Sequence, residues 1–135
     1  MYYGKEIPTQ ARTLKRNEMA KKQADLQNEA VRKYSFLKEM YEDSYFPPKL
    51  VDKGKKILAE LCLQIEREQP KTLEELYKLT HSATDDFNEL QEEFLEADSE
   101  IETAARDCIG SDFDFIATAY GFEADGEELI ATREW

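Results

Sequence analysis

The sequence predicts an all-α protein, an antiparallel helical bundle of about four main helices followed by a short helix at the C-terminal end. Apolar residues recur three and four residues apart in several separate stretches of the chain. Proline or a helix-capping sequence separates each stretch from the next, and nothing indicates a pair of strands. Because the connections are short, consecutive helices are expected to run antiparallel.

The first predicted helix covers the basic N-terminal part of the chain. Residues 9–38 are rich in alanine, lysine, glutamine, glutamate and leucine, which favour helices. The clearest apolar spacing comes late in this stretch, at Ala30, Tyr34, Leu37 and Tyr41. We expect a polar helix that packs from about Tyr34 onward and stops at Pro47 and Pro48. An alternative is an arm, residues 1–37, that docks on the acidic body of its own chain or of a neighbouring copy.

The next two helices are predicted at residues 51–68 and 73–97. Pro70 ends the first, because proline disfavours a helical conformation in the residue before it. Thr72 and Glu75 form a capping box at the start of the second. The core positions expected on the first are Ile57, Leu58, Leu61, Cys62 and Ile65. Those expected on the second are Leu73, Leu76, Tyr77, Thr80, Ala83, Thr84, Phe87, Leu90, Phe94 and Leu95.

A fourth helical stretch begins with a second capping box, formed by Ser99 and Glu102. The residues expected to face the core after it are Ile101, Ala104, Ala105, Cys108 and Ile109. Gly121 has the position of a C-terminal cap, with Phe122 as its apolar partner. A short last helix is predicted over residues 125–135.

Gly110 and Asp112 allow two interpretations of this fourth stretch. The favoured one is a break at Gly110, after which Ser111 or Asp112 caps a restarted helix. If the helix continues, Asp112 lies among the apolar positions, where an unpaired carboxylate is costly. Asp112 would then need a raised pKa or a partner. The candidate partners are His81, Arg106 and Arg133.

The net charge of −12 is unevenly distributed along the chain. Residues 1–38 carry nine bases and four acids, whereas residues 39–135 carry nine bases and 26 acids. We therefore expect a basic N-terminal arm at residues 1–37 and an acidic helical domain at residues 38–135. An acidic domain is a poor candidate for binding nucleic acid or anionic lipid, because their phosphates would repel it.

The cytoplasm is the expected location. No stretch approaches the ~20 apolar residues that span a bilayer. The first residues contain no apolar run typical of a signal peptide. Cys62 and Cys108 are expected to be thiols in the core, as is usual in a reducing compartment.

Known catalytic and cofactor motifs are absent from the sequence. It contains no phosphate-binding loop, dinucleotide-binding glycine motif, nucleophile elbow or zinc-protease motif. Helical bundles that hold two metal ions use Glu-x-x-His pairs, but Lys78 stands three residues before the single histidine, His81. We expect neither a metal nor a cofactor, and a packing role for His81. The alternative is a small enzyme or ligand-binding protein with a polar pocket formed by His81, Arg106, Asp112 and Arg133.

The third helix carries an acidic face, which is the candidate partner-binding site. Its residues are Asp85, Asp86, Glu89, Glu92, Glu93 and Glu96. Between Lys78 and Arg106 there are nine acids and no base. Like charges four residues apart destabilise a helix by a few tenths of a kcal/mol, and a basic partner would relieve that repulsion. The alternatives are a solvated surface, the chain's own N-terminal arm, or a loosely bound divalent cation.

Several segments resemble a small bacterial family, domain of unknown function 5713. They are SYFPP at 44–48, LVDKGK at 50–55, LYKLTH at 76–81, SEIETAAR at 99–106 and IATREW at 130–135. The resemblance covers about residues 38–135. It implies a bacterial cytosolic protein and carries no activity.

The leading hypothesis from the sequence is a non-enzymatic, acidic helical interaction protein that binds or neutralises a basic protein. The comparison with small immunity or antitoxin-like proteins is an analogy only. A further hypothesis is a homodimer in which the basic arm of one copy covers the acidic face of its neighbour.

Overall fold

The computed structural model describes residues 23–135 and confirms the all-α class, with no strand among these residues. The first 22 residues, which hold most of the predicted arm, lie outside the described part. The helices are α2 (Glu29–Lys33), α3 (Lys38–Tyr41), α4 (Pro48–Glu68), α5 (Leu73–Glu96), α6 (Thr103–Ala119) and α7 (Gly126–Leu129).

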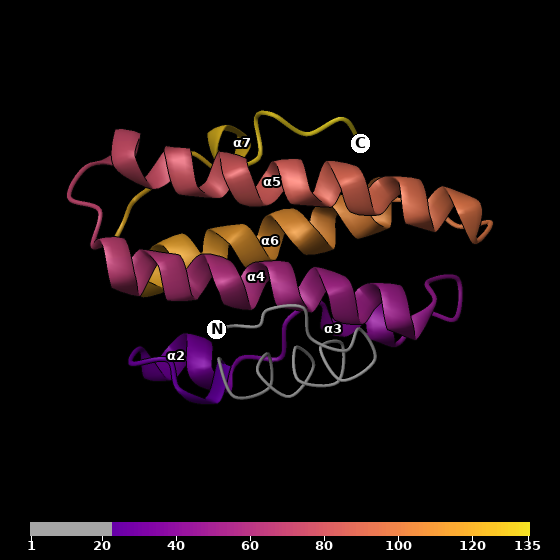
Figure 1. Cartoon of the computed structure of the whole chain (residues 1–135), viewed down its shortest axis with the longest axis horizontal. Coiled ribbons are helices and arrows are strands. Elements are labelled where there is room, and N and C mark those ends of the chain that lie inside the picture. Colours follow the sequence, from indigo (N-terminus) through magenta and orange to yellow (C-terminus); the bar gives the residue numbers. More distant parts are fainter. Residues whose placement is uncertain (1–22) are drawn as a thin grey trace, which may run out of the picture.

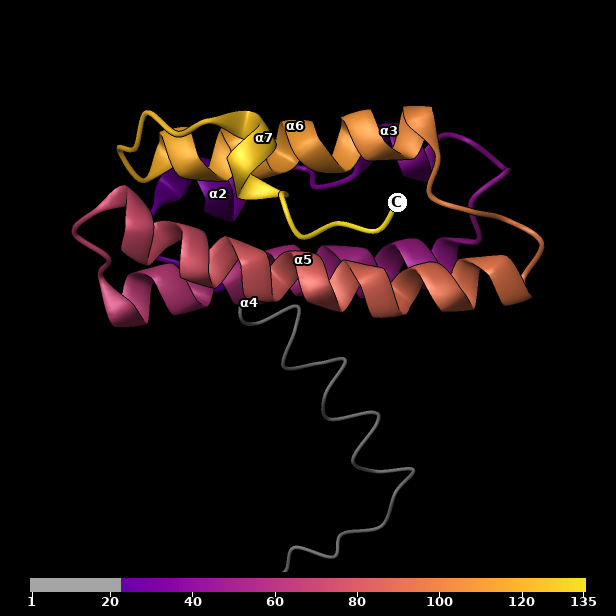
Figure 2. The same ribbon diagram turned by 90° about the horizontal axis from the view of Figure 1, so that it is seen from above.

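These helices form two layers (Figures 1 and 2). One layer is the antiparallel pair of α4 and α5, which lie side by side along their lengths. The other contains α6, with α2 and α3 against one part of it and α7 against another. The core between the layers is apolar. Its largest fully buried side chains include Phe36, Phe87, Phe94 and Phe113.

Helix α4 begins three residues before its predicted start, with Pro48 in the first turn. Proline suits this position because its missing N–H needs no partner there. Four of the five predicted core residues are buried, namely Leu58, Leu61, Cys62 and Ile65, and Ile57 is partly buried. The helix ends at Gln69, whose left-handed backbone (φ 51°) precedes Pro70 as predicted.

Helix α5 confirms the predicted start and end. The Thr72 hydroxyl accepts a hydrogen bond from the Glu75 amide at 3.1 Å. Glu75 reaches back to the Lys71 amide at 2.7 Å, one residue before the predicted partner. Two predicted core residues are wrong: Leu73 and Leu95 lie near the ends of the helix and are exposed.

The predicted capping box at Ser99 and Glu102 is wrong. Asp98 adopts a left-handed conformation (φ 59°), and the Ser99 amide donates to the Phe94 carbonyl at 2.8 Å. Ser99 therefore closes the end of α5. Helix α6 begins after Glu102 without a side-chain cap. Ala104, predicted to face the core, is exposed.

Helix α6 is continuous, so the favoured break at Gly110 is wrong. Asp112 is 3% exposed and lies within the helix. The predicted cap at Gly121 is confirmed, because its φ is 87° and the Phe122 amide donates to the Ala117 carbonyl at 2.9 Å. The last helix, α7, ends at Leu129 instead of continuing through residue 135.

The described part of the N-terminal stretch forms two short helices instead of one. Leu37 has a left-handed backbone (φ 59°), which interrupts the helix between α2 and α3. The side chains that pack are Leu26, Val31, Phe36, Leu37 and Met40, whereas Ala30 and Tyr41 are exposed. The packed body therefore begins before residue 38, the expected boundary.

Candidate functional site

The acidic face lies on the side of α5 that points away from the core. Its exposed members are Asp85, Asp86, Glu89, Glu92 and Glu96. None of these five has an ion pair within residues 23–135. The sixth member, Glu93, pairs with Lys53 of α4 at 2.6 Å. Partial burial raises the pKa of Asp86, and the negative charges of Glu89 and Asp85 add to the increase.

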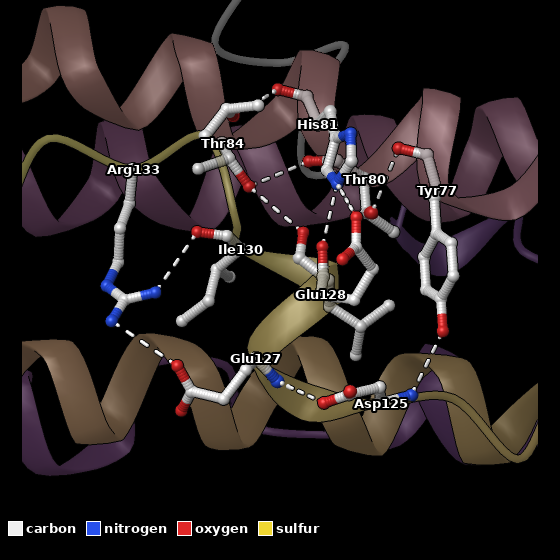
Figure 3. Close-up of polar contacts among 11 residues, drawn as sticks. Tyr77, Thr80, His81, Thr84, Asp125, Glu127, Glu128, Ile130 and Arg133 are labelled. Atoms are coloured by element: carbon white, nitrogen blue, oxygen red, sulfur yellow. Dashed lines mark hydrogen bonds and ion pairs between the residues drawn. The ribbon is translucent and has the colours of Figure 1, made fainter.

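His81 lies on α5 one turn before Asp85 of the acidic face. It holds the C-terminal segment, residues 125–135, through Glu128 (Figure 3). Its Nε2 is 2.7 Å from the Glu128 carbonyl oxygen and 3.3 Å from the Glu128 carboxylate. A carbonyl oxygen can only accept, so Nε2 is the donor. The ring stacks on Tyr77 with a centroid distance of 6.1 Å. His81 thus anchors a neighbouring segment.

Three other α5 side chains contact the same segment. The Tyr77 hydroxyl accepts from the Asp125 amide at 3.1 Å. Thr84 Oγ1 lies 2.8 Å from the Thr80 carbonyl and 3.3 Å from the Leu129 carbonyl. The Asn88 amide group donates to the Thr132 carbonyl at 3.0 Å and accepts from the Glu134 amide at 2.8 Å. We call Tyr77, His81, Thr84 and Asn88 the polar stripe of α5.

Asp112 is buried on the other side of α6, against the joint between α2 and α3. One carboxylate oxygen accepts from the Tyr34 hydroxyl at 3.0 Å, and the other accepts from the Leu37 amide at 2.7 Å. Burial raises the pKa of Asp112 from 3.8 to about 6, while these two hydrogen bonds act to lower it. The nearby charge of Glu39 adds to the increase.

The two cysteines are free thiols in the core. Burial raises the pKa of Cys62 and of Cys108 to about 12. The Cys108 thiol lies 3.4 Å from Glu39, whose charge further disfavours the thiolate. Because the thiolate is the nucleophilic form, neither cysteine is suited to covalent catalysis at neutral pH.

Residues 30–135 match the model of DUF5713, a family of unknown function. The chain belongs to this family. No curated protein and no solved structure matches the chain.

The family match begins at residue 30, earlier than the resemblance seen in the sequence. In this DUF5713 chain it includes Tyr34 and Leu37, the two partners of Asp112. Among residues 23–135, no helix combines the length and apolar character needed to cross a membrane. The same residues contain no group of three or more histidines, cysteines and acids placed to hold a metal ion.

Three of the four residues predicted to form a polar pocket, His81, Asp112 and Arg133, have different partners in this DUF5713 structure. Arg133 contacts the Ile130 carbonyl at 3.3 Å and the Glu127 carboxylate at 3.4 Å. His81 and Arg133 therefore meet the same short helix, α7, at different points (Figure 3). Asp112 faces the α2–α3 joint. Arg106 Nε is buried without a hydrogen-bond partner in the described part of the chain.

The sequence analysis missed a second anchor, Glu66, which is partly buried. The Glu66 carboxylate accepts from the Gln27 and Asn28 amides at 2.9 and 3.0 Å. It also accepts from the Tyr120 hydroxyl at 2.6 Å, and the Asn28 side chain donates to the Ala119 carbonyl at 2.7 Å. A lone glutamate on a polar helix position carries no local signal for such contacts. Only the tertiary structure brings these groups together.

Proposed function

We propose that this protein is a non-enzymatic interaction protein of the bacterial cytoplasm that binds or neutralises a basic protein through the acidic face of α5. The observation that carries the proposal is the set of five exposed carboxylates without an ion pair in the described residues. A basic partner would supply the missing counter-charges and relieve the repulsion between them. The excess of acids in residues 39–135, 26 against nine bases, also favours a basic partner.

Helix α5, which carries the acidic face, is packed on two sides. Helix α5 is packed against α4 on one side, where Lys53 and Glu93 form their ion pair. On the other side the polar stripe holds the C-terminal segment. Carboxylates on such a supported helix keep a fixed spacing, which favours recognition of a partner with a matching array of lysines or arginines.

The chain itself contains one competing basic sequence. Residues 1–22 carry six lysines and arginines and two glutamates. If these residues occupy the acidic face, a basic partner must displace them, and their removal would strengthen partner binding. If they do not, their removal would act only through the more negative net charge, and this effect would be largely screened at physiological salt. A truncated chain starting at residue 23 compared with the full chain separates these cases, with both samples checked for helicity.

The main test is charge reversal on the full chain. The triple variant Glu89→Lys, Glu92→Lys, Glu96→Lys is compared with the matched control Glu68→Lys, Asp107→Lys, Asp114→Lys, whose three sites are also exposed. The probe is a fluorescent decalysine peptide, whose binding is followed by anisotropy at low and physiological salt. Both variants change the net charge equally, so they separate a local site from bulk attraction.

The expected result is that the control variant retains most of the binding and the α5 variant loses at least ~10-fold in affinity, about 1.4 kcal/mol. Circular dichroism checks that both variants keep their helices. Equal losses in the two variants would show attraction by net charge alone and would remove the acidic face as a specific site. Proteins captured from a bacterial lysate by the control variant but not by the α5 variant would identify the partner.

A further inference from the structure

The C-terminal segment is bound by α5 in the way that a protein binds a peptide. Side chains of α5 contact successive main-chain groups of the segment. These groups are the Asp125 amide, the Glu128 carbonyl, the Leu129 carbonyl, the Thr132 carbonyl and the Glu134 amide. Contacts to main-chain atoms hold an irregular backbone without depending on the side chains that it exposes.

Asn88 illustrates this mode of binding. Its side-chain nitrogen donates to the Thr132 carbonyl, and its side-chain oxygen accepts from the Glu134 amide. Both polar groups of the side chain therefore bind the main chain of the segment. Three side chains of the segment are buried, and they determine which sequence can occupy this position beside α5. They are Leu129, Ile130 and Trp135, with exposed fractions of 0%, 5% and 9%. Trp135 packs edge-on against Phe87 of α5 at 6.2 Å.

The connection to this segment is a short turn at the end of α6. Gly121 has a φ of 87°, and the Gly121 amide donates to the Thr118 carbonyl at 2.9 Å. A positive φ is readily adopted by glycine and costly for other residues. The direction in which the segment returns to its own α5 therefore depends on this one conformation.

We propose that residues 125–135 exchange between two copies of the chain, so that the segment of one copy occupies the polar stripe of the other in a dimer. The partner is an identical chain because the one sequence known to fit the stripe is the segment itself. Exchange preserves every contact of residues 125–135 with α5 and α6. The rearrangement is confined to the turn at residues 121–124, in which Phe122 and Ala124 pack against the core. Short turns of this kind are where segment exchange occurs.

The first test uses one glycine substitution with a matched control. Gly121→Ala adds a methyl group that meets no atom within 4 Å, so its effect comes from the backbone conformation alone. Gly126→Ala also meets nothing within 4 Å, and the backbone there has no positive φ. Full-length chains are unfolded, refolded at about 1 mM, the effective concentration typical of short linkers, and measured by light scattering.

We expect Gly121→Ala to raise the dimer-to-monomer ratio roughly 5- to 30-fold for each turn that opens, because alanine disfavours the closed turn. Gly126→Ala should match the unmodified chain. If Gly121→Ala remains monomeric, or if Gly126→Ala dimerises equally, the proposal is overturned.

The second test removes residues 122–124, which prevents the segment from turning back onto its own α5. Trp135 is the single tryptophan of the chain, so its fluorescence reports directly on docking of the segment. Exchange predicts a dimer with the blue-shifted emission of a buried tryptophan. A monomer, or a dimer with the red-shifted emission of an exposed tryptophan, would contradict exchange. Asn88→Ala in the same shortened chain should lower the dimer fraction.

Discussion

The main-chain amide of Leu37 donates a 2.7 Å hydrogen bond to the carboxylate of Asp112, which lies 75 residues further along the chain. Both groups are buried, at 1% and 3% exposure. Leu37 also has the left-handed backbone that separates α2 from α3. A single carboxylate in α6 therefore fixes the point at which the N-terminal stretch changes direction.

Two substitutions of Asp112 should separate the contribution of its hydrogen bonds to stability from that of its charge. Asp112→Ala leaves the buried Leu37 amide without an acceptor and should lower the free energy of unfolding by about 1–3 kcal/mol. Asp112→Asn keeps an oxygen for that amide and an N–H for the Tyr34 hydroxyl, and it should be as stable as the unmodified chain at pH 7, or more so. Urea denaturation measures both variants. Equal losses in the two would mean that the hydrogen bonds do not matter.

The charge of Asp112 should make stability depend on pH. Its pKa in the folded state, about 6, lies above the ordinary value of 3.8, so the folded protein binds this proton more tightly. The resulting stabilisation is complete below pH 3.8 and is lost as the pH rises through 6, by up to about 3 kcal/mol. Other acids also titrate, so the measured quantity is the difference between the unmodified chain and Asp112→Asn. If the difference in unfolding free energy between the two proteins stays constant from pH 4 to pH 7, the raised pKa of Asp112 is contradicted.

Two glycines inside long helices should respond oppositely to alanine. At Gly54 the added carbon would lie 2.8 Å from Leu37 Cδ1 and 3.1 Å from Phe87 Cε1, so overpacking should outweigh the gain in helix propensity. At Gly110 the nearest atom is Ile130 Cδ1 at 3.4 Å, so Gly110→Ala should stabilise by up to about 1 kcal/mol. Thermal melting of both variants tests this. Shifts of the same sign in the two would show that the space around Gly54 is not the deciding factor.

Glu66 should show the pH dependence opposite to that of Asp112. Burial opposes its charge, but hydrogen bonds from Gln27, Tyr120 and Asn28 outweigh that effect and hold its pKa below 4.5. Its stabilisation is present above pH 4.5 and is lost as the pH falls. Glu66→Gln should therefore cost about 1 kcal/mol at pH 7 and little at pH 3, as measured by denaturation. The exposed Glu68→Gln serves as the control and should have little effect at either pH.

The elements that the sequence predicted well are those determined by local patterns. The Thr72 cap, the Pro70 stop and the Gly121 turn each depend on residues within a few positions of one another. The predicted core positions of α5 also depend only on helical spacing. This prediction was wrong for Leu73 and Leu95, which lie near the ends of the helix and are exposed.

The elements that it predicted poorly depend on distant partners. The helix break expected at Gly110 is absent, because α6 continues and buries Asp112, whose carboxylate binds the Leu37 amide across 75 residues. A packing role was expected for His81, but its specific contact with Glu128 follows from the path of the C-terminal segment. Five of the six residues predicted for the acidic face are exposed, whereas Glu93 is partly buried and pairs with Lys53. The role of this face in binding a partner stays a prediction.

The hydrogen bond between Asn28 and the Ala119 carbonyl spans 91 residues, and that between Tyr34 and Asp112 spans 78. During synthesis, α4 and α5 can pair as soon as both have emerged, because four residues join them. The apolar side chains of residues 26–37 emerge before α6, against which they pack in the folded protein. At roughly 5–20 residues per second, a delay of 78 residues lasts about 4–16 s. Nascent chains thus expose part of this stretch to chaperones for seconds, because α4 emerges early but α6, which supplies the rest of its binding surface, does not yet exist.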